Sequence, residues 1–258
     1  MRNQESTNIM SVESKEQIAT LLSWDSDFFG FQVASLLPRQ IGIDVLTSTL
    51  DRLWRDGVKL VYWPSDPTDP VSHMAATFCG GVLVDRKCLY TRNIPTGLYS
   101  KTRISGIEKL SETSELNEDL CKLALQCGIF SRFNVDPNFP KEGWEALYRE
   151  WMKNSINCTF ADAVLVKQEL DCIFGVITLS VHGGLGKIGL LGVNEKSRGQ
   201  GIGRKLIFAA LDWFKNRGVS RVEVLTQGDN LAACRLYESC GFVLDKTDDF
   251  YHFWNPME

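Results

Sequence analysis

The sequence predicts an α/β fold in which a mixed sheet is flanked by helices. Short apolar or alternating runs, typical of strands, are separated by amphipathic segments with helical spacing. A glycine-rich turn at Arg198–Gly203 lies between a strand run and a long amphipathic segment. In addition, the first hundred residues match the end of the chain at a constant offset of 161 positions. A chain of 258 residues can hold one large domain or two small ones.

Composition and charge exclude several classes of protein. A net charge of −4 argues against a nucleic-acid surface, and no apolar stretch reaches the ~20 residues that cross a membrane. Residues 1–17 are polar and lack the apolar core of a signal peptide, so we expect a disordered tail and a cytoplasmic protein. The eight cysteines form no C-x-x-C pair and the three histidines no H-x-x-x-H spacing. We therefore expect reduced thiols and no metal.

The matching segments predict the same order of elements in both halves: helix, glycine turn, strand, turn, helix, glycine, strand. Gly80 aligns with Gly241, and each glycine suits the C-cap of the preceding helix. The first half has no counterpart of the glycine turn at 198–203. We expect a truncated N-terminal domain at residues 18–100 beside a complete domain at 101–258.

The region between the two matching segments predicts two helices followed by strands. Residues 115–128 place their apolar side chains on one helical face, and residues 144–151 can form a second helix. Strand patterns follow at 163–166, 174–180 and 188–193.

The glycine turn has the properties of an anion site. A turn that opens a helix presents unpaired backbone N–H groups and the positive end of the helix dipole, which suits a phosphate. Gly201 and Gly203 permit close approach of a ligand, because a Cβ would collide there. By itself, the turn is equally consistent with a plain connection between a strand and a helix.

The residues after the turn add a second pattern. Residues 221–226 alternate as a strand, and Asn230 is a good N-cap for a helix that reaches Cys240. Tyr237 lies seven positions after Asn230, so both side chains can share one face of that helix. In the first half, Asp69 and Ala76 occupy the corresponding positions.

Taken in order, the strand, the R-x-x-G-x-G turn, the helix, the next strand and N-(x)6-Y-(x)3-G-F resemble the acyl-CoA core of the GNAT superfamily of N-acetyltransferases. The resemblance implies a GNAT fold, with a mostly antiparallel twisted sheet, and acetyl-CoA as co-substrate. It also implies that backbone groups of the strand hold the pantetheine arm, with the N–H of Leu191 on the thioester oxygen. The turn would cradle the pyrophosphate, and the Asn230 side chain would bind the pantetheine arm. The implied acetyl-CoA residues are Leu190, Leu191, Gly192, Val193, Arg198, Gly199, Gln200, Gly201, Ile202, Gly203, Arg204, Asn230 and Tyr237.

Tyr237 is the predicted general acid. A phenol with a pKa near 10 is protonated at pH 7 and can donate to the departing thiolate. The alternative is that Tyr237 is simply a core residue of an amphipathic helix. The base stays open, since residues 187–193 contain no carboxylate; Glu223 and a chain of waters are the alternatives.

Two further stretches resemble the TDP-fucosamine acetyltransferases, which acetylate a nucleotide-linked amino-deoxysugar. Trp24–Gly30 has the pattern Trp-x-x-x-Phe-Phe-Gly, and Ser131–Phe133 is followed by an aromatic helix and by Cys158–Phe160. The resemblance implies that Arg132 meets a substrate phosphate. It also implies that aromatic side chains stack on the base or line the sugar pocket, and these are Trp24, Phe28 and Phe29. The alternatives are an ion pair for the arginine and an interdomain core for the aromatic residues.

These observations favour an N-acetyltransferase acting on the amine of a nucleotide-activated amino-deoxysugar, as in surface polysaccharide biosynthesis. A protein N-terminus, a lysine or another small amine is the alternative acceptor, and a non-catalytic acyl-CoA-binding regulator is the alternative class. The expected partners are acetyl-CoA and a small-molecule amine, such as a TDP-amino sugar. A homodimer is a further alternative.

Overall fold

The computed structural model describes residues 17–95 and 106–256. The predicted tail thus lies almost wholly outside the described residues, as does the predicted domain boundary at 100/101. The elements of the first half are β1 (Ala19–Leu21), α1 (Ser23–Phe29), β2 (Val33–Leu36), α2 (Ile43–Arg55), β3 (Leu60–Ser65), α3 (Pro70–Phe78) and β4 (Val82–Asn93). Those of the second half are β5 (Ile107–Lys109), α4 (Glu118–Gly128), α5 (Arg132–Val135), α6 (Lys141–Ile156), β6 (Ala163–Glu169), β7 (Cys172–His182), β8 (Leu185–Val193), the 3-10 turn η1 (Glu195–Ser197), α7 (Ile202–Lys215), β9 (Arg221–Gln227), α8 (Leu231–Ser239) and β10 (Val243–Trp254).

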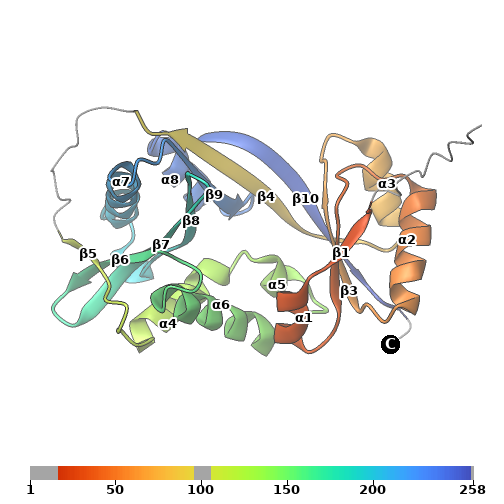
Figure 1. The fold of residues 1–258 in the computed structure, drawn as a ribbon, viewed down its shortest axis with the longest axis horizontal. Coiled ribbons are helices and arrows are strands. Elements are labelled where there is room, and N and C mark those ends of the chain that lie inside the picture. Colours follow the sequence, from red (N-terminus) through yellow and green to blue (C-terminus); the bar gives the residue numbers. More distant parts are fainter. Residues whose placement is uncertain (1–16, 96–105, 257–258) are drawn as a thin grey trace, which may run out of the picture.

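The described strands form one sheet of ten, in the order β1-β2-β3-β10-β4-β9-β8-β7-β6-β5 (Figure 1). Only the β2–β3 and β8–β9 pairs are parallel. The predicted α/β fold with a mixed, mostly antiparallel sheet is therefore confirmed.

The predicted elements of the second half are present, with shifted ends. The helix predicted from residue 115 begins at Glu118, because the Asn117 side chain accepts a hydrogen bond from the Leu120 N–H at 2.9 Å and caps it. The second helix is twice as long as predicted, since α6 runs from Lys141 to Ile156. The short helix α5 had no sequence signal, yet it carries Arg132.

Helices cover both faces of the sheet. The pair α2 and α3 packs on side chains such as Val61 and Trp63, and α7 packs on Val222 and Val224. On the opposite face, α4, α5 and α6 enclose an apolar core that contains Tyr62 and the side chains of β6 and β7. Among the described residues, no helix is both long and apolar enough to cross a membrane.

The two halves exchange their last strands. Strand β10 of the second half lies between β3 and β4, and β4 of the first half lies between β10 and β9. Leu60 pairs with Trp254, and their counterparts at an offset of 161, Arg221 and Asn93, pair in the same way. Strands β4 and β10 run side by side between the two parts of the molecule (Figure 1). The repeat found in the sequence thus has the same strand register in both halves, while its division into two domains stays a prediction.

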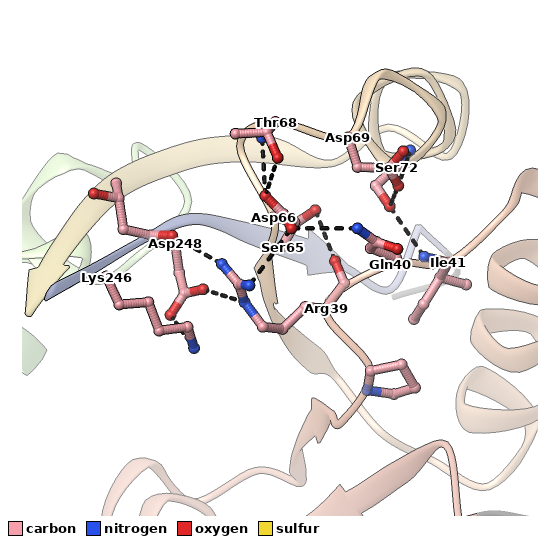
Figure 2. Close-up of polar contacts among 12 residues, drawn as sticks. Arg39, Gln40, Ile41, Ser65, Asp66, Thr68, Asp69, Ser72, Lys246 and Asp248 are labelled. Carbon is pink, nitrogen blue, oxygen red and sulfur yellow. Dashed lines mark hydrogen bonds and ion pairs between the residues drawn. The ribbon is translucent and has the colours of Figure 1, made fainter.

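The loop between β2 and α2 is tied down by polar side chains (Figure 2). The Arg39 Nε donates to Asp248 at 2.6 Å, and its Nη1 lies 3.5 Å from Asp66. The Ile41 N–H donates to the Ser72 hydroxyl at 3.0 Å. This loop aligns with the glycine turn of the second half, and its polar groups are satisfied by the protein itself.

Candidate active site

A cavity of about 1050 Å³ opens between the two halves. We call the part of its wall formed by the end of β8, the glycine turn and the first turns of α8 the first arm. The part formed by β4, α5 and α6 is the second arm. Strand exchange builds this arrangement, because β4 carries first-half side chains into the wall beside β9.

Strand β8 separates from β9 halfway along its length. Their pairing ends at Ile188 and Val224, whereas the pairing of β8 with β7 continues to Val193. The Leu190 N–H donates to the Thr178 hydroxyl at 2.8 Å, and the Asn194 N–H donates to the Phe174 carbonyl oxygen at 2.8 Å. Because backbone groups alternate along a strand, the N–H groups of Leu191 and Val193 point away from β7. An extended ligand can pair with them as an added strand would.

The N–H of Leu191 faces a thiol that sequence reasoning did not place. Cys127, on α4, has its pKa raised to about 12 by burial, although the Leu191 N–H and the Arg198 charge oppose the rise. A Cβ on Gly192 would lie 3.1 Å from the Cys127 sulfur and 3.0 Å from the Leu123 oxygen. The glycine therefore allows α4 to pack closely on β8 at the centre of the cavity.

The glycine turn leaves backbone donors unpaired. Gly199 and Gly201 have φ values of +78° and +75°, in the region that favours glycine. Gly201 is the N-cap of α7 and supplies no side chain, so the first N–H groups of the helix, from Ile202 to Arg204, have no partner within the helix. The exposed Gln200 completes the turn. This is the geometry of a phosphate-binding helix start.

Three turn residues have roles that the sequence did not predict. The Arg198 Nε donates to the Val193 carbonyl oxygen at 3.2 Å and so ties the turn to the end of β8. Arg204 donates to the Ser239 carbonyl oxygen at 3.0 Å, near the end of α8. A Cβ on Gly203 would lie 2.9 Å from the Leu236 side chain, so this glycine also permits the close contact between α7 and α8. That it makes room for a ligand stays a prediction.

Helix α8 presents Asn230 and Tyr237 to the cavity. The Asn230 side-chain oxygen accepts from the Ala233 N–H at 3.2 Å and confirms the predicted N-cap, which leaves its amide NH₂ to donate. Tyr237 is 4% exposed, and its ring packs against those of Tyr90 and Phe242. Burial raises the pKa of Tyr237, and nearby thiols add to the rise. The phenol therefore stays protonated at neutral pH.

The second arm contains charged residues that sequence reasoning missed, apart from Arg132. Asp85 and Lys87 both line the cavity from β4, two positions apart and so on one face. Burial raises the pKa of Asp85 to about 6. Burial and the Arg132 charge lower the pKa of Lys87 to about 7. No sequence motif marks either residue as functional, because both lie on a strand whose neighbours in the sheet, β9 and β10, are distant in the chain.

Arg132 lies among aromatic rings, where the resemblance had suggested a phosphate contact. Its guanidinium carbon is 4.3 Å from the centre of the Phe133 ring and 4.6 Å from those of Tyr62 and Phe250. Its Nε is buried without a hydrogen-bond partner. Within the described part of the chain, neither Arg132 nor Lys87 makes an ion pair with a carboxylate. The second arm of the cavity thus has two basic side chains that make no ion pair with a carboxylate of the described residues.

The aromatic residues near the N-terminus lie beside the cavity and do not line it. Trp24 and Phe28 stack with ring centres 5.2 Å apart, and Phe29 packs against Phe133 and Phe139. Phe28 and Phe29 are partly buried against the apolar core under α4 and α6, whereas Trp24 is exposed. Their contact with a substrate stays a prediction.

Glu223, an alternative base, also lines the cavity. Its carboxylate lies 3.6 Å from the Arg221 Nε. No group of three or more potential metal ligands occurs among residues 17–95 and 106–256.

Comparisons with known proteins agree with this geometry. Residues 115–242 match the model of the acetyltransferase (GNAT) family. The chain is 31% identical over 155 residues to N-alpha-acetyltransferase 30 of Schizosaccharomyces pombe, covering 91% of that protein and 54% of this chain. The chain therefore belongs to the GNAT family of acetyltransferases, which take the acetyl group from acetyl-CoA.

Other relatives are longer than the region they share with this chain. The spore coat polysaccharide biosynthesis protein SpsD of Bacillus subtilis is 26% identical, over 55% of this chain and 48% of that protein. A mycothiol acetyltransferase of Kineococcus radiotolerans is 29% identical, over 58% of this chain and 54% of that protein. The chain thus spans about half the length of these two relatives.

Solved structures support the fold over nearly the whole chain. A GCN5-related N-acetyltransferase of Sphaerobacter thermophilus superposes with a TM-score of 0.61 at 16% identity, over 92% of this chain and 76% of that one. A tandem GNAT protein from the clavulanic acid biosynthesis pathway superposes with a TM-score of 0.52 at 13% identity, over 88% and 76%. Both cover the first half as well as the second.

Proposed function

We propose that this protein acetylates the amine of a small anionic acceptor, and that the acceptor is a nucleotide-linked amino-deoxysugar. The carrying observation is the lining of the cavity: the first arm has the features of an acetyl-CoA groove, and the second has two basic side chains, Arg132 and Lys87, that make no ion pair among the described residues. A diphosphate would compensate the charge of Arg132 and Lys87. The partial similarity to SpsD supports a sugar-linked acceptor.

In this proposal, each predicted acetyl-CoA residue acts through an observed feature. The unpaired N–H groups that open α7 hold the pyrophosphate, and the free edge of β8 from Leu190 to Val193 binds the pantetheine arm. The Asn230 amide donates to a pantetheine carbonyl. The Leu191 N–H, which faces the Cys127 thiol, polarises the thioester oxygen. Tyr237 then donates its proton to the thiolate.

The proposed acceptor is tested by mixing the protein with acetyl-CoA and TDP-4-amino-4,6-dideoxygalactose. We expect release of free thiol and a product that carries one added acetyl group. Arg132→Met should raise the KM for the sugar nucleotide about tenfold or more, because a charge-assisted contact to phosphate is lost. Arg149→Met is the matched control, since Arg149 is exposed on α6 and pairs only with Glu145 at 3.3 Å. No thiol release would rule out this sugar nucleotide.

A peptide N-terminus is the second candidate acceptor, because the similarity to N-alpha-acetyltransferase 30 covers most of that protein. A panel of short peptides with free N-termini would separate the two proposals. Turnover on peptides that Arg132→Met leaves unchanged would favour this second acceptor.

A location in the cytoplasm and assembly as a homodimer are also proposals. Fractionation of cells that produce the protein tests the first, and sedimentation equilibrium of the purified protein tests the second.

A further inference from the structure

We propose that Asp85 is the general base that takes the proton of the acceptor ammonium. The inference rests on the proposed function, since it concerns proton transfer in the same cavity. It names a catalytic residue in the first half of the chain, outside the segment that matches the family model.

The position of Asp85 follows from the pinned turn between β9 and α8. The Gly228 N–H donates to the Arg86 carbonyl oxygen at 2.7 Å, and a Cβ on Gly228 would lie 3.2 Å from the same oxygen. This close contact holds the turn against β4 immediately beside Asp85. The turn continues into Asn230 and then into the helix that carries Tyr237. Asp85 therefore lies on the cavity wall beside the start of α8. In this proposal, the acceptor nitrogen approaches the thioester along this wall.

The Asp85 carboxylate has the chemical state that a base requires. It is 8% exposed and makes no ion pair within the described part of the chain. Desolvation makes it a stronger base than an ordinary carboxylate, with its pKa near 6, yet it is still ionised at pH 7. Charges face it from each side: Lys87 on β4 and Arg132 on α5 favour ionisation, and Asp229 of the turn opposes it. Asp25 on α1 and Asp248 on β10 act on Lys87 in turn.

Three other groups of the cavity wall, Glu223, Asp229 and Lys87, are weaker choices. The Glu223 carboxylate is paired with the Arg221 Nε at 3.6 Å, and Asp229 is exposed to solvent, which stabilises its ionised form. Lys87 has its Nζ 4.4 Å from the centre of the Phe250 ring, where a cation is favoured, and its positive form helps to keep Asp85 ionised.

The proton balance is complete with Asp85 and Tyr237. An N–H bond of the ammonium breaks and an O–H bond forms on Asp85, which frees the lone pair of the nitrogen. That lone pair attacks the thioester carbon, and the C–S bond breaks as the tetrahedral intermediate collapses. Tyr237 gives its proton to the sulfur, and a second proton from the nitrogen restores the phenol. Asp85 releases its proton to water, so one proton appears in solution for each amide formed.

Asp85→Asn is the central test, with TDP-4-amino-4,6-dideoxygalactose as the acceptor, or an amine that the panel shows to be acetylated. We expect kcat/KM at pH 7 to fall about a hundredfold or more, with binding of acetyl-CoA unchanged. The acid limb of the wild-type pH profile should lie near pH 6 and be replaced in the variant by a rise that follows the free amine. Asp85→Glu should restore part of the rate. Asp51→Asn is the matched control, since Asp51 is exposed on α2 and does not line this cavity, and it should keep wild-type turnover and the same acid limb. Loss of the acid limb in Glu223→Gln instead would assign the base to Glu223.

The titration of the Asp85 carboxyl group is a second test, and it does not require that the protein acetylate any amine. In ¹³C-carboxyl NMR of the CoA complex, the resonance that Asp85→Asn removes should titrate near pH 6. If the wild type acetylates no amine, the proposed function fails, and this titration still decides whether Asp85 is prepared as a base. Titration at the ordinary aspartate value, or wild-type turnover in Asp85→Asn, overturns the inference.

Discussion

The two halves of this molecule share one sequence repeat, but they differ in the loop that follows their second matching strand. In the second half, β8 extends beyond its pairing with β9, and the glycine turn leaves backbone donors unpaired. In the first half, β2 pairs with β3 over three residues and then ends at Leu36. The loop that follows is tied by Arg39 to Asp66 and Asp248 (Figure 2). The comparison teaches that the repeat preserves the sheet, while the loop after the second strand differs: in the first half its side chains bond to the protein, and in the second half its backbone donors are left unpaired.

The helix after the third strand shows the same contrast. Asp69 caps α3 with both carboxylate oxygens, which accept from the Val71 and Ser72 N–H groups. Asn230 caps α8 with its oxygen and keeps an amide for a ligand. The fully buried Ala76 stands at the position of Tyr237. Within the described residues, the first half contributes Asp85, Lys87 and Leu89 to the wall of the cavity and lacks the side chains of Asn230 and Tyr237 at the matching positions.

The largest expected effect is on kcat, and it comes from Tyr237, whose position in the first half is occupied by Ala76. Tyr237→Phe should lower kcat by about 10²- to 10⁴-fold at pH 7, because the departing thiolate loses its proton donor. The KM for acetyl-CoA should change little. Tyr251→Phe is the control from the strand of the second half that pairs with β3, where the hydroxyl contacts the His73 Nδ1 at 2.8 Å. Full turnover of Tyr237→Phe in steady-state assays would contradict the general-acid role.

The next effect concerns the exchanged strand β10. Burial lowers the pKa of His252 to about 4, against 6.5 in the unfolded chain. Its stabilising contribution is therefore complete above pH 6.5, and it is lost as the pH falls toward 4, because the unfolded state binds the proton first. We expect a loss of about 3 kcal/mol in the free energy of unfolding from this group. Urea unfolding at pH 7 and pH 4.5 measures it.

His252→Gln tests the assignment of that pH dependence. The variant starts less stable at pH 7, because the contact of 2.6 Å with Asp136 changes. Its further loss between pH 7 and pH 4.5 should be clearly smaller than that of the wild type. An equal loss in both proteins would assign the dependence to other groups.

The next prediction compares two arginines: Arg39 in the loop between β2 and α2, and Arg198 in the glycine turn before α7. Arg39→Met should lower the free energy of unfolding by about 1–2 kcal/mol, since it removes charged hydrogen bonds to Asp248 and to the Thr247 carbonyl oxygen. Turnover should persist. Arg198→Met should instead raise the KM for acetyl-CoA severalfold with little change in stability, because Arg198 is exposed beside the proposed pyrophosphate site. Chemical denaturation and steady-state kinetics are measured on both variants. A raised KM for acetyl-CoA in Arg39→Met, or a loss of stability without a change of KM in Arg198→Met, would contradict this contrast.

The smallest effect compares two glycines at helix starts. Gly201, before α7, has a φ of +75°, so Gly201→Ala should cost about 1 kcal/mol and weaken acetyl-CoA binding. Gly42, before α2, has a φ of −77° and open space around its Cβ position, so Gly42→Ala should leave stability and binding nearly unchanged. Thermal unfolding and calorimetric titration with acetyl-CoA distinguish the two sites.

Local features of the site were predictable because their cause is local. The glycine turn, the Asn230 cap and the position of Tyr237 depend on backbone geometry and helical spacing within about forty residues. Asp85 and Lys87 could not be found this way. They reach the cavity only because β4 pairs with β9, more than a hundred residues later in the chain. Likewise, the packing of Phe29 against Phe133 and Phe139 joins residues about a hundred positions apart, and no motif specifies it.

The sequence by itself determined the α/β fold, the internal repeat and the acetyl-CoA features, because short-range patterns encode strands, helices, caps and glycine turns. Only the tertiary structure decided that the halves exchange their last strands and share one sheet. It also decided which charged side chains become buried together, since desolvation depends on every neighbouring element and on none of them alone. The shifted pKa values of Asp85 and Lys87 in the second arm of the cavity therefore depend on how the strands and helices pack together.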